Sequence, residues 1–259
     1  MSDNDGNPPS DGHPMPTPAT KRFALSKIVF VCVGEQKLRY ALHESILVSE
    51  CPFFEKCLSS DMKEAQDGEI HLPEDNPSAF DVLVQWMYTK HIAQNDATNL
   101  ALAYNLADKL CMPALQNIII DCVRKKPMIP GSLRPDFVHW IWNRTTEGSK
   151  LRDLYVDKLH YHLSMKPETY KIGDGQHASA FRAILQDVDP LVSAVLWKFV
   201  EQGKTGKSVT AHRNLQDPAS LVGCVYHIHK NGEKCDSSAD YRGILHPEIV
   251  SPFGRHSSS

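Results

Sequence analysis

The feature that most constrains the fold is a short β-branched run followed by a series of amphipathic segments. Residues 28–33 read IVFVCV and end at Gly34, which predicts a buried strand closed by a turn. The polar turn of residues 34–37 leads into residues 38–42, which we expect to return as the second strand of a hairpin. A third short strand is predicted at residues 69–72. The first third of the chain is therefore predicted to hold a small sheet.

Three helical segments are predicted next, each with an apolar face. The first begins after Asn76, a favourable N-cap residue, with Pro77 in the first helical position. Its apolar residues then recur at helical spacing as far as Tyr88. Residues 100–111 repeat this periodicity, and Pro113 begins another helix of the same kind. The short connections between them indicate helices that pack in pairs.

Composition divides the chain into four parts. Residues 1–24 are rich in proline and polar residues and are predicted to be a disordered tail. Residues 25–126 form the predicted mixed domain. A proline-punctuated linker then opens a helical extension over residues 127–202. Residues 203–259 are predicted to hold a polar linker, a Cys/His hairpin and a second disordered tail.

The charge and the apolar content narrow the class of protein. The 259 residues carry a formal net charge of −3, and 41% of them are hydrophobic, which is typical of a globular protein. The lack of a basic excess argues against direct binding to nucleic acid or to a membrane surface. No apolar run approaches the length of a membrane span. The seven cysteines form no C-x-x-C pair. We therefore expect an intracellular protein, cytoplasmic or nuclear, with mostly reduced thiols.

Three blocks of sequence, in the correct order, resemble the BTB/POZ family. The opening block comprises residues 26–34, the HESIL stretch at 43–47 and the PFF stretch at 52–54. The middle block is LPEDNPSAF at residues 72–80, followed by WMYT at residues 86–89. The closing block is LADK at residues 106–109 and MPALQ at residues 112–116. Residues 143–152 and 224–229 further resemble blocks of BTB proteins that are expanded in filamentous fungi.

This resemblance implies a fold and a function. The expected fold is α+β, with a small mixed sheet flanked by helices and followed by a mainly helical C-terminal region. Members of the family have protein partners and no catalytic residues, many form homodimers, and some recruit cullin-3 ubiquitin ligases. We therefore expect an adaptor or scaffold that associates with itself or with other proteins.

The resemblance also points to a self-pairing surface. Dimerising relatives usually carry Asp just before the first strand and Lys or Arg after the His, whereas this chain has Lys27 and Glu44 there. Both charges are reversed, so their attraction across an interface would survive, and an ordinary family member would be repelled. The alternative is a pair of unrelated surface charges.

A cullin-3 contact is predicted from a second set of residues. The stretch Met62-Lys63-Glu64 matches the hydrophobic-x-Glu element of cullin-binding relatives. A methionine can fill an adaptable apolar pocket, and a glutamate supplies an orienting charge. Phe54 and Tyr88 lie where relatives add contact surface. The alternative is a loop in which Met62 packs locally.

The candidate metal ligands are four residues near the C-terminus: Cys224, His227, His229 and Cys235. Zinc favours such ligands in tetrahedral sets. However, the Asn-Gly pair at residues 231–232 predicts a hairpin. Alternation along its strand would put both histidines on one face and Cys224 on the other. A zinc site and a structural hairpin with packed cysteines both remain open.

Two function classes follow from these patterns. One is the BTB adaptor, and the other is a metal-stabilised regulatory protein centred on the Cys/His hairpin. An enzyme is not expected, because phosphate-binding loops and H-E-x-x-H are absent from the sequence. His43 has no nucleophile with an orienting carboxylate near it in the sequence, so we interpret it as structural.

Overall fold

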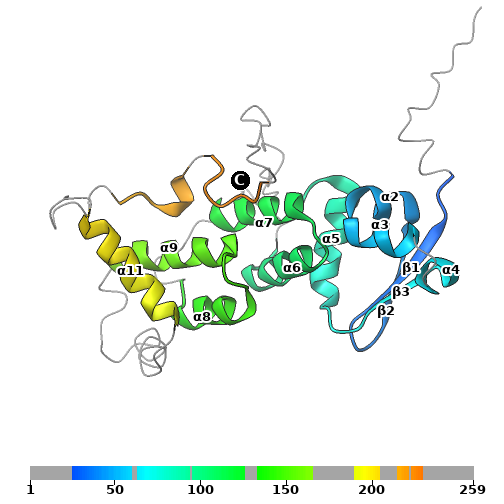
Figure 1. Ribbon diagram of the computed structural model, residues 1–259, viewed down its shortest axis with the longest axis horizontal. Coiled ribbons are helices and arrows are strands. Elements are labelled where there is room, and N and C mark those ends of the chain that lie inside the picture. Colours follow the sequence, from blue (N-terminus) through cyan, green and yellow to red (C-terminus); the bar gives the residue numbers. More distant parts are fainter. Residues whose placement is uncertain are drawn as a thin grey trace, which may run out of the picture.

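The computed structural model describes residues 25–59, 63–93, 95–125, 133–165, 190–204, 215–221 and 223–229. These residues form an elongated body with a sheet at one end and helices along the rest (Figure 1). In chain order the elements are β1 (Ile28–Val33), β2 (Leu38–His43), α2 (Glu44–Glu50), α3 (Pro52–Ser59), α4 (Lys63–Asp67), β3 (Glu69–Leu72), α5 (Pro77–Thr89), α6 (Ala97–Lys109), α7 (Pro113–Lys125), α8 (Pro135–Arg144), α9 (Lys150–Met165), α11 (Pro190–Lys204) and the 3₁₀ turn η3 (Pro218–Ser220).

The sheet has β1 at its centre, in the order β2-β1-β3. β1 pairs antiparallel with β2 and parallel with β3, which confirms the predicted hairpin and the third strand. Alternate residues of a strand share a face. On the inner face, Val29, Val31 and Val33 are each 0% exposed, because this face lies in the hydrophobic core. The sheet is therefore mixed and buried on one side.

The turn after β1 requires glycine. Gly34 has a φ of +76°, and a Cβ added there would lie 3.1 Å from Cγ of Pro77. This close approach packs the turn against the first turn of α5. Asn76 caps that helix, and its side chain accepts hydrogen bonds from the backbone N–H groups of Ser78 and Ala79. The predicted N-cap and first-turn proline are therefore confirmed.

The helices continue the core away from the sheet. α6 packs against both α5 and α7, and further along the chain α9 packs against both α8 and α11. Figure 1 shows α8, α9 and α11 at the end of the body opposite the sheet. The predicted fold class, a small mixed sheet with helices and a mainly helical C-terminal region, is confirmed.

One buried lysine links the two helical groups. Lys158 of α9 is 3% exposed, and its Nζ donates a hydrogen bond over 2.8 Å to the carbonyl oxygen of Val123, in the last turn of α7. Carbonyls in the last turn have no partner within their own helix, and a cation is favourable there. Lys158 therefore caps α7 from the neighbouring element.

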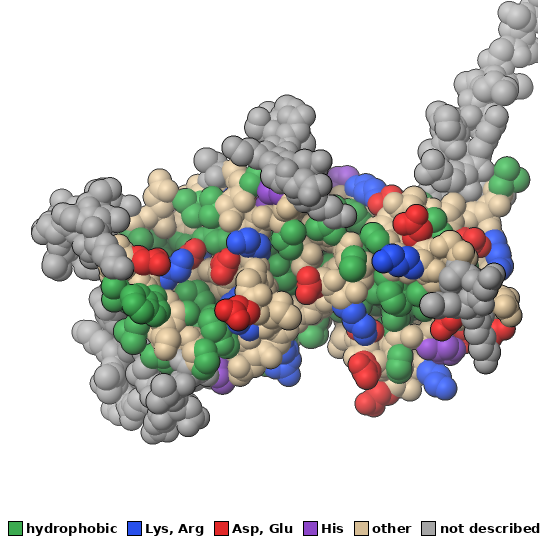
Figure 2. Space-filling view, viewed as in Figure 1, with side chains coloured by type: hydrophobic (Ala, Val, Ile, Leu, Met, Phe, Trp, Pro, Cys, Tyr) green, Lys and Arg blue, Asp and Glu red, His purple; other side chains and the backbone are tan. Residues whose placement is uncertain are grey.

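The surface in Figure 2 mixes acidic and basic side chains and shows no broad patch of one sign. In the described part of the chain, no helix has the length and apolar character that crossing a membrane demands. The predicted N-terminal tail, residues 1–24, lies outside the described residues. So do the proline-punctuated linker up to residue 132 and everything after residue 229.

Candidate functional site

The start of β1 and the start of α2 form one exposed surface. The backbone N–H of Glu44 donates to the carbonyl oxygen of Lys27 over 2.9 Å, and that of Ser45 donates to the Ser26 hydroxyl, also over 2.9 Å. These bonds place Lys27 and Glu44 next to each other in one chain. Lys27 is exposed and Glu44 is partly exposed. Both charges are therefore accessible to a partner.

Apolar side chains flank these two charges. Leu25 is 88% exposed and Ile28 is 41% exposed. We call Leu25, Lys27, Ile28 and Glu44 the amino-terminal surface. Exposed apolar groups bordered by charged ones are the arrangement that protein interfaces use, with an apolar centre and a polar rim.

The outer face of the sheet carries a polar cluster around Glu69. The Arg39 guanidinium lies 3.6 Å from the centre of the Phe30 ring, and its Nη2 is 3.7 Å from the Glu69 carboxylate. The Cys32 thiol donates to Oε1 of Glu69 over 3.2 Å, and Nε2 of His71 is 3.5 Å from the same oxygen. The Glu69 carboxylate is therefore shared among three neighbours.

The residues predicted to contact cullin-3 have different environments. Phe54 is 0% exposed, so the expectation that it adds contact surface is wrong: its ring is part of the core. Tyr88 is 37% exposed, and Glu64 lies partly exposed in the first turn of α4. Met62 lies outside the described residues. Two of the four predicted residues therefore reach the described surface.

His43 lies in a structural environment. Its backbone N–H donates to the Tyr88 hydroxyl over 3.0 Å, and its Nδ1 is 2.9 Å from the same oxygen. These contacts join the end of β2 to the last turn of α5. The geometry agrees with the interpretation of His43 as a residue that fixes the hairpin against the helices.

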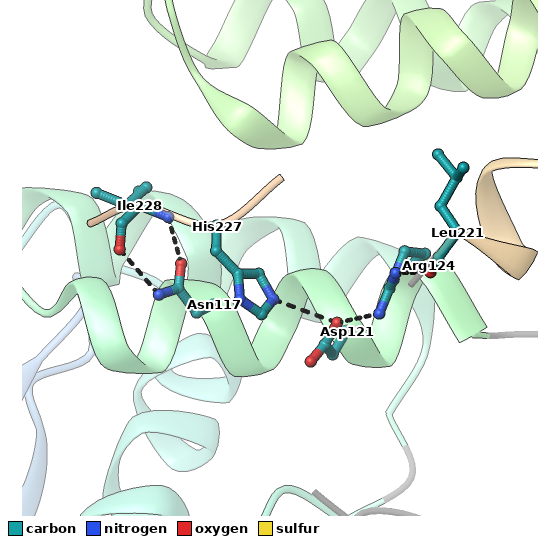
Figure 3. Close-up of polar contacts among 6 residues, drawn as sticks. All are labelled: Asn117, Asp121, Arg124, Leu221, His227 and Ile228. Atoms are coloured by element: carbon teal, nitrogen blue, oxygen red, sulfur yellow. Dashed lines mark hydrogen bonds and ion pairs between the residues drawn. The ribbon is translucent and has the colours of Figure 1, made fainter. Parts of the chain in front are cut away.

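A second candidate site lies where the C-terminal segment, residues 215–221 and 223–229, crosses α7 (Figure 3). The side chain of Asn117 makes two hydrogen bonds to the backbone of Ile228. Its Oδ1 accepts from the Ile228 N–H over 2.7 Å, and its Nδ2 donates to the Ile228 carbonyl over 3.0 Å. One amide side chain thus satisfies both backbone groups of a residue that lies between two histidines.

A buried charged group follows one turn further along α7. Nε2 of His227 is 3.3 Å from Oδ1 of Asp121, and Nη2 of Arg124 is 2.7 Å from the same oxygen (Figure 3). Arg124 also donates to the carbonyl oxygen of Leu221. Burial alone would raise the pKa of the Asp121 carboxyl, but its contacts with His227 and Arg124 outweigh burial and lower that pKa. Asp121 is therefore held as a carboxylate.

The other end of the segment is held by α9. Tyr226 is 3% exposed, and its hydroxyl donates to Oδ2 of Asp157 over 2.8 Å. The second oxygen of Asp157 lies 3.0 Å from Nζ of Lys198 in α11. The C-terminal segment is thus anchored on both α7 and α9.

Three of the four predicted metal ligands come together in this segment. The candidate ligand atoms of Cys224, His227 and His229 all lie within 4.8 Å of one another. The expectation that Cys224 faces away from the histidines is wrong, because residues 224–227 form a turn and not a strand. The backbone N–H of His227 donates to the Cys224 carbonyl over 3.1 Å and closes this turn. Cys235 and the predicted Asn-Gly turn lie outside the described residues.

A cavity of about 460 Å³ adjoins this cluster. Its walls come from α6, from the connection between α8 and α9, and from the C-terminal segment. The polar residues that line it are Tyr104, Asp108, Thr146, Glu147, Ser149, Lys150, His227 and His229. The two histidines are therefore shared between the ligand cluster and the cavity.

The polar stripe of α7 is the feature that the sequence analysis missed. Asn117, Asp121 and Arg124 are 8%, 3% and 6% exposed, although polar residues at positions i, i+4 and i+7 usually indicate a solvated helix face. The partner that buries the stripe lies about a hundred residues away in the chain, which local periodicity does not reveal.

The family model of the BTB/POZ domain matches residues 22–126, which include the sheet and the helices from α2 to α7. A comparison with curated proteins found no match. BTB/POZ domains are generally protein–protein interaction modules, and the family is not a catalytic one. Residues 22–126 of the chain therefore form a BTB/POZ domain, and a mainly helical region follows this domain.

Proposed function

We propose that this chain is a non-catalytic adaptor whose BTB/POZ domain binds protein partners and pairs with a second copy of itself. The observation that carries the proposal is the amino-terminal surface, where Leu25 and Ile28 are exposed beside Lys27 and Glu44. An apolar pair supplies area for association, and the charges give register and specificity.

The position of the two charges suits a symmetric dimer. In a two-fold interface, if residue i contacts residue j of the partner, then j also contacts i of the partner. Lys27 and Glu44 are adjacent in each chain, because the Glu44 N–H bonds to the Lys27 carbonyl. One two-fold axis beside them can therefore bring both opposite-charge pairs together.

Charge-swap variants test this pairing. Lys27→Glu leaves two acidic residues on the surface, and Glu44→Lys leaves two basic ones. Each variant alone should dimerise more weakly, by about 5- to 30-fold, because two like-charge contacts cost about 0.5–1 kcal/mol each. An equimolar mixture of the two variants should recover association, because every contact in the mixed dimer again joins opposite charges.

The mixing experiment distinguishes a Lys27–Glu44 contact between two chains from a contact within one chain. A Lys27–Glu44 attraction within a single chain would be lost in both variants and would not return on mixing. Association constants from sedimentation equilibrium at two ionic strengths give the readout, since salt should weaken the mixed dimer. Full-strength dimers of both single variants, or a mixture no tighter than either, would contradict pairing at this surface.

A contact with cullin-3 is a finer proposal for the same domain. It retains Met62, Glu64 and Tyr88 and drops the buried Phe54. The support is that Glu64 and Tyr88 are accessible and that Met62 completes the matching motif. Isothermal titration of the full chain with purified cullin-3 should show binding that Met62→Ala and Glu64→Lys weaken by at least about 10-fold, whereas Glu74→Lys should not. Absence of binding to the unmutated chain would refute it.

A further inference from the structure

Three side chains of the C-terminal segment form a ligand set with no role in the proposed adaptor function. We propose that Cys224, His227 and His229 bind one Zn²⁺ ion. Their candidate ligand atoms lie within 4.8 Å of one another, a spacing from which small rotations bring all three to a common ion. A thiolate and two imidazoles are the ligands that zinc prefers in tetrahedral sites.

The backbone that carries these ligands is held in place by α7. Ile228 lies between the two histidines, and both its N–H and its carbonyl bond to Asn117. The turn that brings Cys224 back toward the histidines is closed by the hydrogen bond from the His227 N–H to the Cys224 carbonyl. The ligand set is therefore preorganised by contacts that involve no metal.

Asp121 supplies the outer contact that a zinc-binding histidine commonly has. Its Oδ1 lies 3.3 Å from Nε2 of His227, and Arg124 holds the same carboxylate from the other side. A carboxylate on one ring nitrogen fixes the orientation of the imidazole and leaves the other nitrogen, Nδ1, for the metal. Both Asp121 and His227 are buried, so bulk water does not compete for the contact between their side chains.

Three protein ligands leave one position of a tetrahedral site for another group. His227 and His229 line the cavity of about 460 Å³, together with Asp108 and Glu147. A water molecule or a group that enters this cavity can complete the coordination. The site would then tie the C-terminal segment to α7 and place the ion at the wall of the cavity.

Another cluster, Cys32, Glu69 and His71 on the sheet, has a similar spacing but is less suited to the ion. Its carboxylate is already shared with Arg39, 3.7 Å away. Burial, followed by the hydrogen bond to Glu69, raises the pKa of the Cys32 thiol, which opposes formation of the thiolate that a metal needs. This cluster provides a matched control for the C-terminal one.

The experiment is metal binding by the full chain, purified without a histidine tag. The chain is dialysed against ZnCl₂ with a competing chelator, and bound metal is measured by mass spectrometry. We expect one Zn²⁺ per chain. Cys224→Ser and His229→Gln should each lower the affinity by more than about 100-fold, and Asp121→Asn by about 10- to 100-fold. His71→Gln should leave the affinity unchanged. Circular dichroism shows whether each variant remains folded.

Cobalt substitution gives a readout that depends on ligand identity. Tetrahedral Co²⁺ should produce strong visible bands, and a thiolate should add a charge-transfer band in the near ultraviolet. The second band should disappear in Cys224→Ser and persist in Cys32→Ser. A stoichiometry near zero for the unmutated chain, or loss of the ion in His71→Gln with retention in Cys224→Ser, would overturn the proposal.

Discussion

At the scale of single residues, Asn117 illustrates how one side chain fixes a distant segment. Its amide makes both of its hydrogen bonds to the backbone of Ile228, 111 positions later in the chain. The backbone groups of Ile228 would otherwise need other partners in a partly buried position, where an unsatisfied polar group costs about 1–3 kcal/mol. The geometry of the candidate zinc ligands therefore depends on a residue that is not itself a ligand.

Asn117→Ala should loosen the C-terminal segment without unfolding the domain. Hydrogen exchange of the backbone amides at residues 226–229 should accelerate by about 5- to 150-fold, which corresponds to a loss of about 1–3 kcal/mol of local stability. Exchange in β1 should not change. Asn143→Ala is the control, because Asn143 is exposed and its amide contacts His139 on the same helix. Unchanged exchange at residues 226–229 in Asn117→Ala would contradict this role.

At the scale of elements, the β1–β2 turn and α5 depend on a single glycine. A residue with a Cβ at position 34 must adopt a positive φ and also sit 3.1 Å from Cγ of Pro77. Gly148, between α8 and α9, also has a positive φ, of +81°, but nothing lies within 4 Å of its Cβ position. A comparison of substitutions at the two glycines therefore separates the free-energy cost of the backbone conformation from that of the close contact.

Gly34→Ala should therefore be more destabilising than Gly148→Ala. The backbone conformation alone costs about 1–2 kcal/mol in each variant. Contact with Pro77 should add about 1–3 kcal/mol at position 34. Urea unfolding followed by fluorescence gives both free energies of unfolding. Equal losses in the two variants would show that the turn does not press against α5.

The junction between α7 and α9 rests on Lys158. Lys158→Met keeps the aliphatic part of the side chain but removes the charged donor to the Val123 carbonyl. We expect a loss of about 1.5–3 kcal/mol, the range for hydrogen bonds to charged groups. Lys150→Met is the control, because Lys150 pairs with Asp153 at the surface, where such pairs contribute about 0–1 kcal/mol. A melting temperature that falls equally in both variants would contradict capping by Lys158.

The elements were predictable wherever their determinants are local. The β-branched run of β1, the cap at Asn76 and the first-turn prolines at positions 77 and 113 all act over a few residues, and the structure has these elements at the predicted positions. The turn at Cys224 was mispredicted because the Asn-Gly pair favoured a hairpin. The described backbone there is set by bonds to α7, which no local pattern encodes.

At the scale of the whole molecule, partner surfaces were only partly predictable. The family resemblance could single out Lys27 and Glu44 as candidate interface residues. The structure places these two residues next to each other on an accessible surface. Exposure is a property of the folded chain, however. Phe54 resembles a contact residue in sequence but is buried, whereas Leu25, which belongs to none of the predicted sites, is 88% exposed. Whether an apolar residue is buried or exposed depends on contacts between distant parts of the chain, which a local sequence pattern does not reveal.

Sedimentation equilibrium of the full chain tests the central claim, self-association through the amino-terminal surface, most directly. The unmutated chain and Leu38→Ser should both have the mass of a dimer, because Leu38 is 51% exposed but lies at the far end of the β1–β2 pair from Ile28. The double variant Leu25→Ser/Ile28→Ser should shift toward the monomer. A monomeric unmutated chain, or a double variant that dimerises as tightly as Leu38→Ser, would contradict the claim.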